Sequence, residues 1–129
     1  MRVREAMNAP VLSVGPHHTL RAAARLMAAR NVGAAAVIDP DTSGIGILTE
    51  RDILRSLGAG QNPDLELAAD HLTSDLVFAG TEWTVDQAAE AMVRGGFRHL
   101  IVLEDGEACG IVSVRDIVRT WSRLASAAG

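Results

Sequence analysis

The sequence contains the same unit twice, and this repetition constrains the fold more than any other feature. The stretch GILTERDIL, residues 46–54, returns as GIVSVRDIV, residues 110–118. Upstream, residues 7–39 align without a gap with residues 72–104, and the offset between the copies drops by one in the turn that follows. A duplicated structural unit tolerates a single-residue difference in a turn. The chain is therefore a tandem repeat.

Each copy predicts the element order β-α-β-β-α. A short apolar stretch, VLSV or LVFA, is followed by a turn and by Thr19 or Thr84, each a candidate helix N-cap. Small apolar residues then recur at helical spacing, and AAAVID or HLIVLE reads as a strand. A tight turn leads into a returning hairpin strand, and the copy ends in a second helix.

The repeats define the expected domain organisation and the fold class. We expect an α+β fold in which residues 1–58 form the first repeat, residues 59–67 a linker and residues 68–129 the second repeat. The linker region holds Gly, Asn and Pro and has no periodicity. The segments REAM and AADHL, which precede the first strand of each copy, read as short helical lead-ins.

Composition excludes several classes of function. The net charge of −4 and the pI of about 5.5 argue against a nucleic-acid-binding protein, which needs a basic surface. Cys109 is the single cysteine, so no internal disulfide can form and a reducing compartment is expected. Neither a signal peptide nor an apolar membrane span is evident. We therefore expect a soluble, cytoplasmic protein with no membrane partner.

The repeated motif Gly-apolar-apolar-Ser/Thr-x-x-Asp has two readings. In the structural reading, Thr49 with Asp52, and Ser113 with Asp116, form capping boxes at the starts of two helices. In the functional reading, the same hydroxyl and carboxylate meet a ligand, because a carboxylate can accept hydrogen bonds from two neighbouring hydroxyls, as a ribose offers. The residues alone leave both readings open.

The element order and the two motif copies resemble the CBS domain, named for cystathionine β-synthase, over about residues 3–124. A tandem pair of such domains forms one disc-like module. The resemblance implies a regulatory role: such pairs bind AMP, ADP, ATP or S-adenosylmethionine in the clefts between the two repeats and often dimerise head to head. We see no further domain in the sequence, which is typical of a stand-alone bacterial protein, so the output is expected either to pass to an unidentified protein partner or to end in the module itself.

The resemblance also implies which residues meet the ligand. Asp52 and Asp116 would hold the ribose, with Thr49 and Ser113 beside them.

Basic residues near these acids would face phosphate. Arg51 and Arg115 precede the two aspartates, although a solvated helix-face charge is the simpler reading for Arg51. Arg98 and His99 stand just before a strand of the second copy, where the first copy has only glycine and alanine at residues 33 and 34. We therefore expect one stronger nucleotide site on the second-repeat side and one weak or empty site.

No catalytic or metal-binding constellation is recognisable in the sequence. His17 and His18 are adjacent and make a poor chelate, and His71 has no partner pattern. Cys109 lies in a turn and reads as a small packing residue. We expect no enzymatic activity and no required cofactor.

Two functions from different classes remain. The first is a non-enzymatic module that binds an adenosine-containing ligand and is a homodimer through its apolar helix faces. The second is a ligand-free dimeric interaction or stress-response scaffold in which the aspartates only cap helices.

Overall fold

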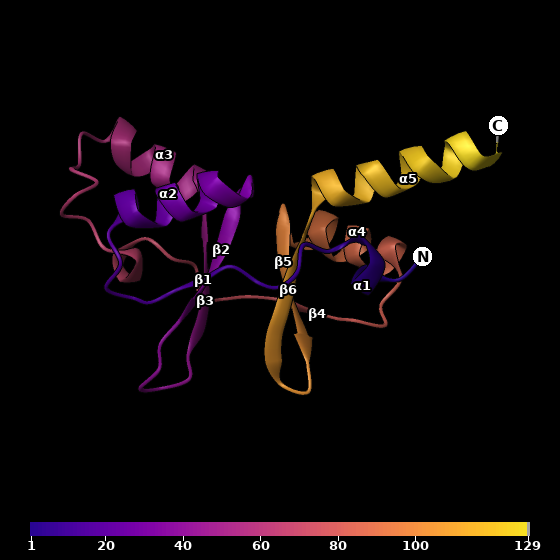
Figure 1. Cartoon of the computed structure of the whole chain (residues 1–129), viewed down its shortest axis with the longest axis horizontal. Coiled ribbons are helices and arrows are strands. Elements are labelled where there is room, and N and C mark those ends of the chain that lie inside the picture. The colour runs from indigo at the N-terminus through magenta and orange to yellow at the C-terminus, as the bar shows by residue number, and fades with distance from the viewer. Residues whose placement is uncertain (129) are drawn as a thin grey trace. The chain divides into compact units, whose positions relative to one another are not determined.

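The computed structural model describes residues 1–128, with side chains to residue 126, and it divides into two compact units (Figure 1). The first-repeat unit comprises Leu12–Leu76. The second-repeat unit combines Met1–Val11 with the chain from Val77 onward. The compact units are thus not the same as the sequence repeats, because the first eleven residues fold with the second copy.

The first-repeat unit is a three-stranded sheet with helices. Its sheet has the order β1-β2-β3, in which β1 runs parallel and β3 antiparallel to β2. In this unit α2 and α3 pack against each other. The elements are β1 (Ser13–Val14), α2 (Leu20–Arg30), β2 (Ala34–Ile38), β3 (Ile45–Thr49), α3 (Glu50–Gly58) and the 3-10 helix η1 (Ala68–Asp70).

The second-repeat unit repeats this architecture. Its sheet has the order β4-β5-β6 with the same strand directions, and α4, α5 and α1 pack together beside it (Figure 1). The elements are α1 (Val3–Ala6), β4 (Phe78–Gly80), α4 (Val85–Gly95), β5 (His99–Glu104), β6 (Glu107–Ser113) and α5 (Val114–Ala128).

These elements confirm the predicted α+β fold class and the β-α-β-β-α order of each copy. Thr19 caps α2 by accepting a hydrogen bond from the Ala22 N–H at 3.1 Å, and Thr84 caps α4 by accepting from the Gln87 N–H at 3.1 Å. Each unit has its own apolar core, with Leu20 and Leu48 fully buried in one and Leu100 and Val112 in the other. No helix in the described part of the chain is both long and apolar enough to cross a membrane.

The segment predicted as a linker packs against the start of α2. The Leu20 N–H donates to the Glu66 carbonyl at 2.9 Å, and the Arg21 N–H donates to the Pro63 carbonyl at 3.1 Å. The Arg21 side chain also forms an ion pair with Asp64. These bonds satisfy N–H groups that a helix start leaves without intrahelical partners. The segment is therefore held by non-local backbone bonds, which no periodicity could have indicated.

Each lead-in segment pairs with the third strand of the other sequence repeat. Asn8 forms a two-way backbone bridge with Ile111 of β6, at 2.9 and 3.1 Å. Thr73 forms the same bridge with Ile47 of β3, at 2.9 Å in both directions. Because the two bridges occupy equivalent places, the duplication includes a reciprocal exchange of lead-in segments.

This exchange explains why both copies of the motif begin with glycine. A Cβ added at Gly110 would lie 2.7 Å from the Asn8 carbonyl oxygen. A Cβ added at Gly46 would lie 2.8 Å from the Leu72 side chain and 3.1 Å from the Thr73 carbonyl oxygen. Only a residue without a side chain lets the lead-in backbone approach the strand this closely.

Candidate functional site

The first candidate site lies at the corner where β3 ends and α3 begins, which we call the first corner. Thr49 is the N-cap of α3 and has an extended backbone. Its hydroxyl accepts from the Asp52 N–H at 3.3 Å, and Asp52 Oδ2 accepts from both the Thr49 N–H and the Thr49 hydroxyl at 2.9 Å. The capping box predicted from the sequence is therefore present.

The second candidate site, the second corner, is the matching place between β6 and α5. Asp116 Oδ2 accepts from the Ser113 N–H at 2.7 Å and from the Ser113 hydroxyl at 2.9 Å. The Asp116 N–H donates to the Ser113 hydroxyl at 3.1 Å. The sequence repetition thus gives the same hydrogen-bond geometry at both corners, and in each case a single carboxylate oxygen accepts both cap bonds that reach the aspartate side chain.

The two aspartates differ in what their other oxygen contacts. Asp116 is only 2% exposed, and its Oδ1 lies 3.4 Å from Nη1 of Arg119, one turn further along α5. Asp52 is half-buried, and within the described residues its Oδ1 makes no hydrogen bond or ion pair. The first corner therefore offers an open carboxylate oxygen, whereas the second corner offers one already held by a cation. The sequence reasoning did not identify Arg119, although its place three residues after Asp116 is a helical pairing distance.

The basic residues predicted at the second corner come together through the backbone. The Val114 N–H donates to the Arg98 carbonyl at 3.0 Å, and His99 lies opposite Ser113 in the antiparallel register. Arg98 and Arg115 are exposed, and His99 is half-buried. The structure thus gathers the second-copy residues at one corner, and it holds the first-copy residues in the other unit.

The corresponding place in the first corner has a different charge. The Glu50 N–H donates to the Gly33 carbonyl at 2.9 Å, so Glu50 takes the place of Val114 and Gly33 takes the place of Arg98. Arg51 is exposed and forms no ion pair with a described residue. The alignment of the two copies already pairs Glu50 with Val114, but Glu50 was not among the residues predicted to meet a ligand.

Backbone amides at both corners are largely occupied. In α3 the N–H groups of Glu50 and Asp52 are already bonded, and in α5 those of Val114 and Asp116 are bonded in the same way. Where a helix start binds an anion, it does so through N–H groups that have no other partner. Side-chain cations would therefore do more of the recognition of any phosphate here than the helix starts themselves.

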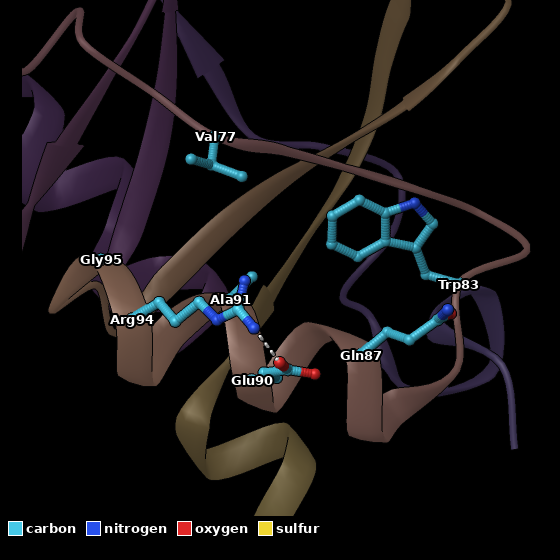
Figure 2. A pocket seen from close by; sticks show the side chains of 7 residues that line it. All are labelled: Val77, Trp83, Gln87, Glu90, Ala91, Arg94 and Gly95. Atoms are coloured by element: carbon cyan, nitrogen blue, oxygen red, sulfur yellow. Dashed lines mark hydrogen bonds and ion pairs between the residues drawn. The ribbon is translucent and has the colours of Figure 1, made fainter.

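A separate surface hollow of about 590 Å³ lies along α4 in the second-repeat unit. Figure 2 shows Val77 and the Trp83 indole facing the side chains of α4 across it, with Glu90 and Arg94 joined by a 2.6 Å ion pair. Its lining residues are Val77, Trp83, Gln87, Glu90, Ala91, Arg94 and Gly95. None of the residues predicted to meet a ligand lines it.

The other polar residues considered from the sequence do not form a cluster. His71 Nε2 lies 2.8 Å from Glu66, and the Gly15 N–H donates to Nδ1 of His18 at 2.9 Å. The Cys109 thiol donates to the Val102 carbonyl at 3.4 Å, and burial raises the pKa of this thiol. No group of three or more metal-ligating side chains is found within the described residues.

Comparison with known proteins gives a consistent result. The family model described as the CBS domain matches residues 3–59 and again residues 68–123. Hypoxic response protein 1 of Mycobacterium tuberculosis is 32% identical over 117 residues, which cover 90% of this chain and 82% of that protein. The chain spans only 41% of another relative, MJ1225 of Methanocaldococcus jannaschii, to which it is 30% identical over 117 residues.

Two solved structures bear on ligands. The CBS domain protein PAE2072 from Pyrobaculum aerophilum, complexed with AMP, is 28% identical with a TM-score of 0.81, over 95% of this chain and 99% of that one. Hypoxic Response Protein I with two coordinated zinc ions is 30% identical with a TM-score of 0.75, over 92% of this chain and 98% of that one.

Proposed function

Because the chain belongs to the CBS-domain family and carries the domain twice, we propose that it is a non-enzymatic regulatory module that binds an adenosine-containing ligand. AMP, ADP, ATP and S-adenosylmethionine are the candidate ligands. The observation that carries the proposal is the division of labour within Asp52, whose Oδ2 makes the cap bonds while Oδ1 stays without a partner in the described residues. Capping and ribose binding are therefore compatible in one carboxylate.

The complex of PAE2072 with AMP supports the choice of ligand class. A ribose presents two neighbouring hydroxyls, and a carboxylate that accepts from both makes charge-assisted hydrogen bonds. At the second corner the same contact would require Arg119 to release Oδ1 of Asp116. Arg119 is half-exposed and the contact is long at 3.4 Å, so a ligand that meets the guanidinium with its own anion can displace it.

The proposed phosphate-facing charge lies at the second corner, where the backbone brings Arg98 and His99 beside Ser113 and Val114, and where Arg115 directly precedes Asp116. Guanidinium groups suit phosphate because their donors match its oxygens in pairs. The second corner is therefore the proposed site for a phosphorylated ligand, and Thr49, Arg51 and Asp52 form the weaker site for such ligands.

Thermal unfolding with millimolar AMP, ADP, ATP or S-adenosylmethionine tests this function. A ligand that binds only the folded state raises the melting temperature by mass action, and a concentration of 100 Kd stabilises by about 2.7 kcal/mol. We expect a shift with at least one ligand and its loss in Asp116→Ala or Asp52→Ala. Absence of any shift across the panel, together with no nucleotide detected by mass spectrometry of the purified protein, would falsify the proposal.

A ligand-free interaction scaffold is the second candidate, and an exposed apolar row on α5 favours it. Val114, Val118 and Trp121 recur at helical spacing on that helix and are 42%, 54% and 45% exposed. A row of this kind is typical of a contact surface, and a second copy of the chain is its proposed occupant. A dimer by sedimentation that is unaffected by every nucleotide, and that Val118→Glu disrupts, would favour this candidate.

A further inference from the structure

The two corners share one backbone geometry but differ in charge at two matched positions. The hydrogen bond from the Glu50 N–H to the Gly33 carbonyl corresponds to that from the Val114 N–H to the Arg98 carbonyl. Glu50 and Gly33 thus replace a valine and an arginine. The exchange removes one positive charge and adds one negative charge at the first corner.

The Glu50 carboxylate lies against Gly33, the residue that precedes β2. A Cβ added at Gly33 would meet Glu50 Oε1 at 3.0 Å, Cδ at 3.1 Å and Oε2 at 3.3 Å. Both carboxylate oxygens therefore face the backbone of the residue that precedes β2. Glu50 forms no hydrogen bond or ion pair with a described residue, so its charge is not neutralised by a partner.

From this arrangement we propose that Glu50 is a specificity-determining residue, which makes the first corner select an adenosyl ligand whose 5′ substituent carries no net negative charge. The inference rests on the proposed function, because it assumes that Asp52 holds a ribose. Adenosine, a 5′-thioether of adenosine or a sulfonium such as S-adenosylmethionine has the required chemistry. AMP, ADP and ATP do not.

The physical reason is like-charge repulsion over a short distance. Glu50 stands two residues before Asp52 in the first turn of α3, so a 5′ substituent of a ribose held at Asp52 would lie near it. Exposed charges interact over about 8 Å, the Debye length at physiological ionic strength. A 5′ phosphate there would meet the negative charges of Glu50 and Asp52, and among the described residues assigned to this corner Arg51 is the cation that could offset them. At the second corner Arg98 and Arg115 offset Asp116, and Val114 adds no charge.

A simpler reading of Glu50 is that an acid in the first turn only stabilises α3 through the helix dipole. That role changes the stability of the unit equally with every ligand. A selectivity role instead changes the ratio of the affinities for charged and uncharged ligands, and it weakens as salt screens the charges. These two signatures separate the readings.

The experiment is a titration of the full-length, ¹⁵N-labelled chain with adenosine and with AMP, followed by amide resonances. The Gly33 amide reports on the first corner and the Val114 amide on the second, so each corner gives its own dissociation constant. The variant is Glu50→Gln. The matched control is Asp41→Asn, which removes one negative charge from the exposed turn at the other end of the β2–β3 hairpin.

We expect the first corner of the parent chain to prefer adenosine, and the second corner to prefer AMP. Glu50→Gln should tighten AMP binding at the first corner by about fivefold at low salt, an ion-pair-sized effect, and leave adenosine binding unchanged. Asp41→Asn should leave the ratio of AMP affinity to adenosine affinity unchanged at both corners. High salt should reduce the increase in AMP affinity caused by Glu50→Gln.

Two results would overturn the inference in distinguishable ways. If adenosine binds the first corner but Glu50→Gln leaves the ratio of AMP to adenosine affinity unchanged, Glu50 does not select the ligand, while the proposed function stands. If neither ligand shifts the Gly33 or the Val114 resonance in the parent chain, this inference fails, and the proposed function fails with it when the thermal-unfolding panel also shows no shift.

Discussion

At the scale of single residues, the two aspartates show how one carboxylate can both cap a helix and remain available to a ligand. Oδ2 of Asp52 and of Asp116 accepts the two cap hydrogen bonds. Oδ1 has no partner among the described residues in the first case and contacts Arg119 in the second. The structural role of each aspartate therefore belongs to Oδ2, and the proposed ligand-binding role belongs to Oδ1 of the same side chain.

Substitutions at Asp116 separate these two roles. Asp116→Ala should lower the free energy of unfolding by about 1–2 kcal/mol, because the Ser113 N–H and hydroxyl lose their acceptor. Asp116→Asn should lower the free energy of unfolding by less, since its amide oxygen can still accept the cap bonds. It should nevertheless bind nucleotide more weakly, because it lacks the charge that strengthens contacts with ribose hydroxyls. Urea unfolding and nucleotide titration of the two variants provide the measurement. An asparagine variant that is as unstable as the alanine variant would contradict this account.

At the scale of elements, the segments that connect the helices and strands are held in place at the start of a helix and beside the third strand of each sheet. The ion pair between Arg21 and Asp64 fastens the segment of residues 59–67 to the first turn of α2. The guanidinium of Arg21 lowers the pKa of the Asp64 carboxyl through a direct hydrogen bond. The glycines at positions 46 and 110 leave room for the backbone at the end of each lead-in segment, which pairs antiparallel with β3 or β6.

The lowered pKa of Asp64 fixes the sign of a pH effect. The folded state binds this proton less tightly than the unfolded state, so the pair contributes stability above the ordinary carboxyl pKa. That contribution is lost as the pH falls through the lowered pKa. The difference in unfolding midpoint between the parent and Arg21→Ala should therefore shrink on acidification, and also at high salt because the pair is exposed. A difference that grows on acidification would contradict the assignment.

Glycine substitutions test how closely the lead-in backbone approaches β6. Gly110→Ala should lower the free energy of unfolding by about 1–3 kcal/mol, because its Cβ meets the Asn8 carbonyl and backbone must shift. Gly58→Ala is the matched control, since a Cβ at the last residue of α3 meets nothing within 4 Å. That control should stabilise the chain by about 0.5–1 kcal/mol through helix propensity. Chemical denaturation followed by circular dichroism measures the free energy of unfolding of both variants. Equal changes in the two variants would argue against a close approach of the lead-in backbone to Gly110.

Sequence patterns predicted the elements of each repeat but not the exchange of lead-in segments. The caps at Thr19 and Thr84 and the strands around Val37 and Val102 follow local spacing rules that need no tertiary information. The bridge between Asn8 and Ile111 is a single residue pair far apart in the chain, so it leaves no periodicity. The orientation of the Glu50 carboxylate over Gly33 likewise depends on backbone geometry. The predicted roles of the ligand-facing residues remain predictions.

At the scale of the whole molecule, the N-terminal segment belongs to the second-repeat unit. Val3 is fully buried in that unit's core, and its N–H donates to the Trp83 carbonyl at 2.7 Å. The Val85 N–H donates to the Met1 carbonyl at 3.0 Å. The start of the chain therefore completes the core of the repeat that is encoded last.

Both tryptophans, Trp83 and Trp121, lie in the second-repeat unit, so tryptophan fluorescence reports on that unit. Val3→Ala should lower the stability seen by fluorescence by about 1–3 kcal/mol, the usual loss for a truncated buried side chain. Val14→Ala, in the core of the other unit, is the matched comparison and should affect circular dichroism more than fluorescence. A Val3→Ala variant with an unchanged fluorescence transition would argue against the assignment of the N-terminus.

The exchange also orders the events of synthesis. The ribosome releases residues 12–76 as one continuous stretch, so the first-repeat unit can close while the rest of the chain is still being made. The first eleven residues emerge earlier still, but their partners before α4 and on β6 are translated only after residues 12–76. The N-terminal segment can therefore pair with its own unit only after the whole of the first-repeat unit has been made.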